Sequence, residues 1–172
     1  ASLDVVMRAL ARGYSILVLD DPSQNHSSAV AAGLFNPITG KKLVKTWFAD
    51  YIFPALERYY LDVERSTGRR FFYELPIYRP FASVRQQNEW MACSVDNSCK
   101  EYISGVFLAS RYSGEVKDPF GGILLKHTGY LDTTSYLEAV REYLQARDAF
   151  RRALFDPDKL SIRENQVAYD HV

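Results

Sequence analysis

The first twenty residues carry a helical and then an extended hydrophobic pattern. Four apolar residues at the i, i+3, i+4 and i+7 spacing predict one buried face of a helix: Leu3, Val6, Met7 and Leu10. Gly13 predicts the end of this helix. The continuous apolar run at residues 16–19 is typical of a parallel strand covered on both faces. Asp20 follows at the carboxyl end of that strand, where open α/β sheets bind their ligands.

Hydrophobic periodicity predicts three further helices and a series of short strands. The helices are expected at residues 47–67, with a bend or a later start at Pro54, at residues 83–91, capped by Ser83, and at residues 133–145, with a capping box formed by Ser135 and Glu138. Residues 102–108 predict either two strands around Gly105 or one bulged strand. The other strands are expected at residues 71–73, 77–79, 121–126, 160–162 and 167–169. This succession predicts the α/β class, α+β overall.

Small residues fill the segment that follows the acidic strand end. The Ser27 and Ser28 hydroxyls can donate to phosphate oxygens, and residues 31–33 (Ala-Ala-Gly) let the backbone approach a bulky ligand. A helix start capped by Ser28 fits the same residues. An acid at a strand end is also often a turn or helix cap. Residues 34–40, which contain Asn-Pro and a terminal glycine, predict a turn.

The order of helix, Gly13, strand, Asp20 and a Ser/Ala loop ending in Ala-Gly resembles the FAD-binding start of the D-amino-acid oxidase and glycine oxidase family. A second block, with Gly-Gly, a strand, Gly-x-x-Asp and a helix at residues 121–145, resembles the same family in the same order. The resemblance implies a partial Rossmann-like FAD-binding domain with an inserted substrate domain of antiparallel sheet and helix. The expected FAD-binding parts are residues 1–45 and 148–172, and the expected substrate (cap) domain is residues 46–147.

The resemblance also implies a set of cofactor contacts. The residues expected to contact FAD are Asp20, Ser27, Ser28, Ala32, Gly33 and Asn36. Among them, Asp20 would bind the ribose and Asn36 would face the flavin ring. The third glycine of the family's Gly-x-Gly-x-x-Gly turn falls at Ser2, so the chain departs from the family there, and we expect it to be the N-terminal half of a family member without its first strand. No catalytic residue is assigned, because the family's substrate-binding arginine would come later.

Composition argues against several other classes of protein. Twenty-one basic and twenty-one acidic residues give zero net charge, without the electrostatic footprint of a protein that binds nucleic acid or an anionic membrane. No apolar run approaches the roughly 20 residues that span a bilayer. Cys93 and Cys99 form no CxxC motif, which argues against a metal site and fits thiols in a reducing compartment.

We therefore expect a cytoplasmic FAD-dependent oxidoreductase that transfers a hydride from a small amine or amino acid to flavin. The expected partner is that small molecule, without nucleic acid, metal or membrane span, and self-association into a homo-oligomer is left open. One alternative is a tRNA-modifying flavoprotein of the same family, against which the neutral charge argues. The other is a non-catalytic α/β interaction module that has lost cofactor binding.

Overall fold

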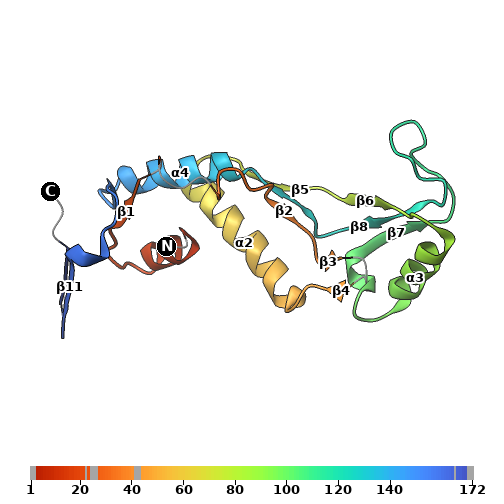
Figure 1. Ribbon diagram of the computed structural model, residues 1–172, viewed down its shortest axis with the longest axis horizontal. Helices are drawn as coiled ribbons and strands as arrows, with labels where there is room; N and C mark the ends of the chain where they lie inside the picture. The colour runs from red at the N-terminus through yellow and green to blue at the C-terminus, as the bar shows by residue number, and fades with distance from the viewer. Residues whose placement is uncertain (1–2, 22, 24–26, 41–43, 165, 170–172) are drawn as a thin grey trace. The chain divides into compact units, whose positions relative to one another are not determined.

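The computed structural model describes residues 3–21, 23, 27–40, 44–164 and 166–169 (Figure 1). Over these residues the chain is mixed α/β, α+β overall, with four α-helices and several small sheets, as the sequence predicted. The chain divides into two compact units. Unit 1 comprises Ala1–Ala31, Arg65–Arg69 and Thr133–Val172, and unit 2 comprises Ala32–Glu64 and Arg70–Asp132.

Unit 1 contains a parallel pair of strands formed by distant segments of the chain. Strand β1 (Val18–Asp20) pairs in parallel with β10 (Phe150–Arg152), so that Asp20 lies opposite Arg152. The predicted parallel strand is confirmed, but it is shorter than the apolar run. Its predicted burial on both faces is wrong, because Leu17 is exposed and Val18 and Leu19 are only half-buried. Among the described residues β1 has β10 as its one neighbouring strand.

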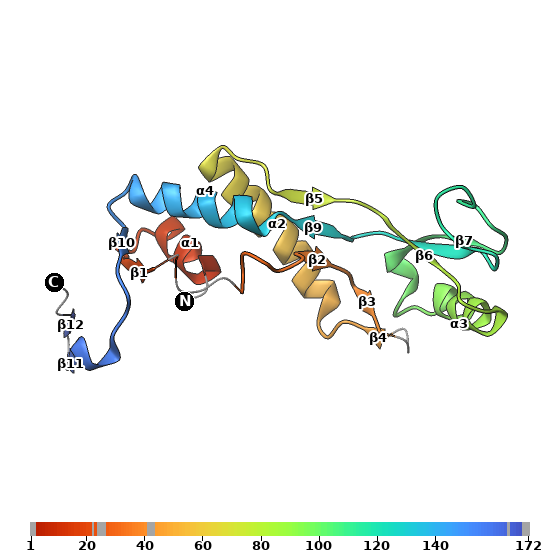
Figure 2. The same ribbon diagram turned by 45° about the horizontal axis from the view of Figure 1, so that its top comes forward.

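Two helices lie with this strand pair in unit 1 (Figure 2). Helix α1 (Leu3–Ala11) buries Val6 and Met7 and is followed by Gly13 at a φ of 81°, as predicted. Helix α4 (Thr133–Gln145) has the predicted bounds. The predicted capping box is wrong, because the helix begins two residues before Ser135. The remaining elements of unit 1 are the turn η2 (Pro157–Lys159) and the antiparallel strands β11 (Leu160–Arg163) and β12 (Gln166–Tyr169).

Three antiparallel sheets form the framework of unit 2. Residues 34–40 were predicted as a turn, but they form two short strands separated by Asn36 and Pro37. A register shift between Ile103 and Gly105 shows that the strand there is single and bulged. The sheets are β2 (Leu34–Phe35), β9 (Gly129–Leu131) and β5 (Phe72–Glu74); β6 (Ile77–Pro80), β8 (Gly122–Leu125) and β7 (Ile103–Phe107); and β3 (Ile38–Thr39) with β4 (Val44–Lys45).

Two helices and one 3-10 turn accompany these sheets. Helix α2 (Ala49–Thr67) runs through Pro54, its sixth residue, so a start at Pro54 is wrong. Helix α3 (Val84–Val95) begins after Ser83, whose hydroxyl accepts a hydrogen bond from the Gln86 N–H at 3.2 Å, as predicted. The turn η1 (Lys100–Tyr102) leads into β7. The core that they enclose with the sheets contains Ile38, Phe53, Phe81, Trp90, Tyr102, Ile123 and Leu125.

None of the described helices combines the length and the apolar character that crossing a membrane requires.

Candidate cofactor site

Asp20 is the last residue of β1, and its side chain is exposed. Its backbone carbonyl accepts a hydrogen bond from the Ala153 N–H at 3.3 Å, which continues the pairing of β1 with β10. Within the described part of the chain, no hydrogen bond or ion pair engages the Asp20 carboxylate. The position therefore has what a ribose-binding acid needs, an accessible carboxylate at the carboxyl end of a parallel strand.

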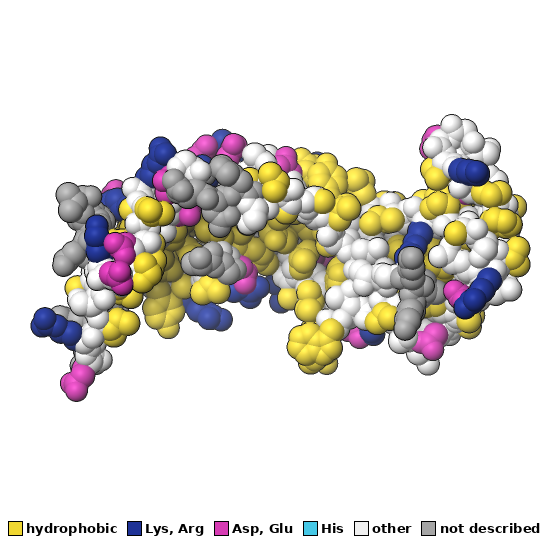
Figure 3. All heavy atoms as spheres, in the orientation of Figure 1, with side chains coloured by type: hydrophobic (Ala, Val, Ile, Leu, Met, Phe, Trp, Pro, Cys, Tyr) yellow, Lys and Arg dark blue, Asp and Glu magenta, His cyan; other side chains and the backbone are white. Residues whose placement is uncertain are grey.

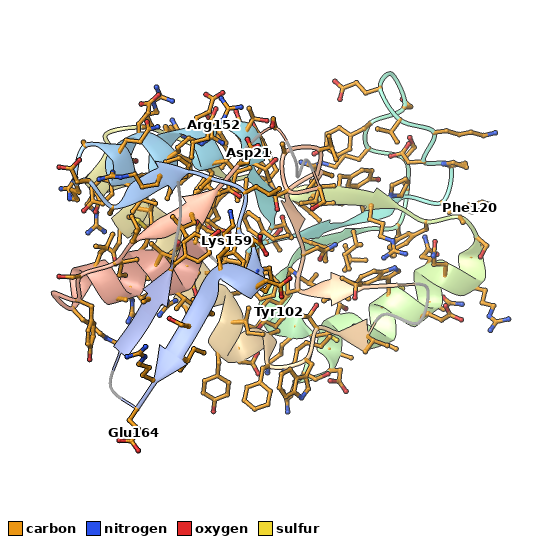
Figure 4. The ribbon with its side chains drawn as sticks, turned by 60° about the vertical axis from the view of Figure 1, so that its left-hand side comes forward. Asp21, Tyr102, Phe120, Arg152, Lys159 and Glu164 are labelled. Carbon is orange, nitrogen blue, oxygen red and sulfur yellow. The ribbon has the colours of Figure 1, made fainter. Side chains whose placement is uncertain are left out.

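The neighbouring acid, Asp21, forms hydrogen bonds with other residues of the chain. Its Oδ1 accepts hydrogen bonds from the Ser23 N–H at 3.1 Å and the Ser23 hydroxyl at 2.8 Å, and the Arg152 Nε donates to the same atom at 3.2 Å. Figure 4 shows Asp21 and Arg152 beside one another. The Ser23 N–H is the main reason that the pKa of the Asp21 carboxyl is lowered. Asp21 thus fixes the turn after β1.

The serine-containing loop is fastened to the start of α4. The Thr133 hydroxyl donates to the Ala31 carbonyl at 3.2 Å, and the Thr134 hydroxyl donates to the Ala29 carbonyl at 3.4 Å. Ser27 and Ser28 are both exposed. Residues 27–30 form a turn, so the alternative of a helix capped by Ser28 is wrong. The two threonines bind loop carbonyls and so attach the loop to the start of α4.

Gly33 lies against β9 in unit 2. The Leu131 N–H donates to the Gly33 carbonyl at 3.0 Å, and a β-carbon on Gly33 would come within 2.0 Å of the Leu131 carbonyl oxygen. Gly33 also has a φ of 66°, a left-handed backbone conformation that residues other than glycine rarely adopt. The glycine is therefore explained by backbone packing alone. Its neighbour Ala32 is exposed.

Asn36 connects β2 to β3. Its Oδ1 accepts a hydrogen bond from the Ile38 N–H at 3.0 Å, and its backbone carbonyl accepts one from the Thr46 hydroxyl at 3.3 Å. The first of these hydrogen bonds holds the side chain, which is half-buried. No hydrogen bond within the described ranges engages the Asn36 Nδ2, so this amide group can donate to a ligand carbonyl.

The six predicted contacts are divided equally between the two units. Asp20, Ser27 and Ser28 belong to unit 1, and Ala32, Gly33 and Asn36 belong to unit 2. Within unit 1 the loop contacts α4, and within unit 2 Gly33 contacts β9. Ser2, the position that corresponds to the family's third glycine, lies outside the described residues.

A second polar cluster joins three elements of unit 2. The buried Tyr102 hydroxyl donates to Asp50 Oδ1, and the Lys45 Nζ donates to Asp50 Oδ2 at 2.8 Å. Burial, and then the hydrogen bond to Asp50, raise the pKa of Tyr102. The hydrogen bond from Lys45 is the first cause of the lowered pKa of Asp50. The Tyr102 hydroxyl and the ion pair of Lys45 with Asp50 therefore link β4, α2 and η1.

Asp118 organises the loop between β7 and β8. It is 2% exposed and accepts four hydrogen bonds: from the Tyr78 hydroxyl at 2.8 Å, the Ser110 hydroxyl, the Arg111 N–H at 2.9 Å and the Tyr112 N–H at 3.1 Å. The Ser110 hydroxyl is the largest of the causes that hold the pKa of Asp118 well below its usual range. Because other groups of the protein occupy its acceptor positions, Asp118 stabilises the loop between β7 and β8.

Two contacts at the candidate site were missed at the sequence level. The Asp-x-Ser spacing of Asp21 and Ser23 is a turn signal that could have indicated Asp21 as the structural acid. The threonine pair at the start of α4 carries no comparable signal, because its carbonyl partners lie more than one hundred residues away.

Among the described residues, no group of three or more His, Cys, Asp or Glu side chains could hold a metal ion. No model of a known protein family matches this chain, and no solved structure matches it with significance.

Proposed function

We propose that this chain belongs to an FAD-dependent oxidoreductase that oxidises a small amine or amino acid by hydride transfer to flavin. The observation that carries the proposal is the parallel pairing of β1 with β10, which leaves the Asp20 carboxylate accessible at the carboxyl end of the pair. Adenine dinucleotides bind at this edge of open α/β sheets, and an acid there accepts hydrogen bonds from ribose.

The arrangement of unit 1 supports a discontinuous Rossmann-like FAD-binding domain. Its first and last segments pair with one another, and most of the residues between them form unit 2. This organisation is what the family resemblance implies for an FAD domain interrupted by a substrate domain. The functional assignment of residues 1–45 and 148–172 to FAD, and of residues 46–147 to substrate, is part of this proposal.

The described residues of unit 1 fit FAD at two positions. The exposed Asp20 carboxylate can accept hydrogen bonds from ribose, and the exposed Ser28 hydroxyl can donate to a pyrophosphate oxygen. Bound FAD would supply the hydride acceptor. The role of this chain would be to hold and orient it, and the fastening of the loop by Thr133 and Thr134 reduces the entropy lost on binding.

FAD titration of the purified chain tests the proposal. We expect saturable quenching of flavin fluorescence, and we expect Asp20→Asn to raise the dissociation constant about tenfold, because a charge-assisted hydrogen bond contributes about 1.5–3 kcal/mol. Glu164→Gln is the control, since it also removes one negative charge and projects from the turn between β11 and β12 (Figure 4). Wild-type protein that fails to bind FAD, or an Asp20 variant with unchanged affinity, would contradict the proposal.

A non-catalytic α/β interaction module is the second candidate. It is favoured by the contact between Gly33 and Leu131, which accounts for the glycine without any ligand. A purified protein that stays colourless after incubation with FAD selects this candidate. Peroxide release from a panel of small amines and amino acids, by FAD-loaded protein, selects the oxidoreductase.

A further inference from the structure

An exposed group of aromatic side chains lies where β4 leads into α2 in unit 2. Trp47 is 78% exposed, Tyr51 73% and Phe48 53%, and Val44 and Ile52 beside them in the chain are exposed as well. We refer to these five residues as the aromatic patch. Hydrophobic side chains project at the start of α2 in the space-filling view (Figure 3). Monomeric proteins rarely leave such a contiguous apolar group in water.

The aromatic patch is held in a fixed conformation. The ring centroids of Trp47 and Phe48 lie 4.3 Å apart, and those of Phe48 and Tyr51 lie 5.6 Å apart. Phe48 has a φ of 56°, a left-handed conformation that a bulky side chain adopts only under constraint. Its carbonyl accepts hydrogen bonds from the N–H groups of Tyr51 at 3.0 Å and Ile52 at 2.9 Å. Rings that are already ordered lose little entropy when they bind a partner.

The size of the aromatic patch suits a dimer interface. A fully exposed aromatic side chain presents about 150–250 Å², so the three rings present about 400 Å² per copy. Two copies in contact would remove about 800 Å² from the rings alone. Val44, Ile52 and the surrounding backbone bring this area toward about 1,000 Å², the lower limit for a specific interface. Tryptophan and tyrosine are also the residues that most often dominate binding energy.

Among the described residues, the charges beside the aromatic patch do not oppose self-association. The nearest described cation, Lys45, is paired with Asp50 at 2.8 Å, so this pair adds no net charge beside the aromatic patch. The whole chain has zero formal net charge at pH 7, so two copies do not repel one another through their overall charge. An uncharged apolar surface is complementary to another of the same kind.

We propose that the aromatic patch is the contact surface of a symmetric homodimer, in which the patch of one copy packs against the same patch of a second copy. A twofold interface requires one self-complementary surface, and a single apolar patch meets that requirement. The proposal is independent of cofactor binding, because all five residues lie outside the predicted FAD contacts.

Sedimentation equilibrium of the full chain, from about 1 μM to about 200 μM, tests the proposal. The expected mass approaches twice 19.7 kDa as concentration rises. Trp47→Ser and Tyr51→Ser should each raise the dissociation constant at least about tenfold. Val95→Ser is the matched control, because Val95 is 79% exposed in the same unit and lies outside the aromatic patch.

Tryptophan fluorescence gives a second readout. The chain has two tryptophans, and Trp90 is fully buried, so Trp47 reports on the aromatic patch. We expect its emission to shift to shorter wavelength as concentration rises, and Tyr51→Ser should remove that shift.

Three outcomes would overturn the proposal. The first is a wild-type chain that remains monomeric over the whole concentration range. A monomeric chain that binds phosphatidylserine vesicles, and loses that binding when Trp47 is replaced, is one form of this outcome. The second is a dimer that survives both patch substitutions. The third is a dimer that Val95→Ser weakens as much as they do.

Discussion

Gly33 and Leu131 pack so closely that a β-carbon on the glycine would lie 2.0 Å from the leucine carbonyl oxygen. The glycine that resembles a cofactor-binding position is therefore also required by the contact of the Ala-Gly segment with β9. A substitution there changes folding whether or not FAD binds, so loss of FAD from a Gly33 variant would not identify a cofactor contact. Asp20 is the position that separates the two effects, because its side chain is exposed.

The first prediction concerns Gly33→Ala. We expect this variant to lose about 2 kcal/mol or more of unfolding free energy, because it combines a left-handed φ with a backbone clash. Urea unfolding measures the loss. Gly40→Ala is the control: it has a similar φ of 72° but nothing within 4 Å of the added carbon, so it should lose only about 1 kcal/mol. Equal losses in the two variants would show that β9 moves away at little cost.

The second prediction concerns pH and Asp118. Its pKa is held down in the folded state, chiefly by the Ser110 hydroxyl, while in the unfolded chain an aspartate titrates at about 3.9. The stability that depends on this carboxylate is therefore present above about pH 4 and is lost as pH falls toward the folded pKa. At pH 7, wild-type protein should unfold at a higher urea concentration than the Asp118→Asn variant. This difference between the two urea midpoints should shrink below about pH 4.

Glu115→Gln in the same loop is the control for that experiment, because Glu115 is exposed. It should leave the urea midpoint nearly unchanged at both pH values. A difference between wild type and Asp118→Asn that is constant from pH 7 to well below 4 would contradict the assignment.

The third prediction concerns Tyr102. Burial, and then the hydrogen bond to Asp50, raise its pKa in the folded state, whereas an unfolded tyrosine ionises at about 10. The contribution of the neutral Tyr102 side chain to the free energy of unfolding is complete below about pH 10. It is lost as pH rises through the pKa of Tyr102 in the folded state. Tyr102→Phe should lose about 1 kcal/mol of unfolding free energy at pH 7, and its stability should fall less steeply than that of wild type above pH 10.

Guanidinium unfolding across the alkaline range measures this difference. Tyr14→Phe is the control, because Tyr14 is 65% exposed, and it should follow the wild-type curve. Parallel alkaline curves for wild type and Tyr102→Phe would rule out the expected contribution.

The fourth prediction concerns the start of α3. The Ser83 hydroxyl accepts from the Gln86 N–H at 3.2 Å, and the Gln86 Oε1 accepts from the Ala82 N–H at 2.7 Å, so each side chain satisfies a backbone donor at the helix start. Ser83→Ala should lose about 1 kcal/mol of unfolding free energy. Ser94→Ala, within the last turn of the same helix, should change it far less. Similar losses would mean that the cap adds nothing beyond the general effect of serine in this helix.

Local patterns in the sequence predicted the elements that depend on neighbouring residues. The apolar spacing of α1 and α4, and the glycine after α1, correspond to observed helices and their end. The Ser-x-x-Glu pattern at Ser135 failed because the same spacing also occurs inside a helix, and the start of α4 is determined upstream of it.

Contacts between distant segments could not be read from the sequence. No periodicity indicates that β10 is the partner of β1, and none indicates that Leu131 occupies the space beside Gly33. The predicted cofactor residues came from a resemblance. The structure accounts for Gly33 in another way, and it leaves Asp20, Ser27 and Ser28 exposed.

The pairing of β1 with β10 also has a consequence for biosynthesis. Asp21 and its partner Arg152 are 131 residues apart, so ribosomes complete the whole of unit 2 before the second strand of the pair has been made. Unit 2 can fold during translation, while the nascent N-terminal segment waits with its apolar strand unpaired. The slowest and most aggregation-prone stage of folding should therefore be the closure of unit 1, which needs a strand that is made only after unit 2.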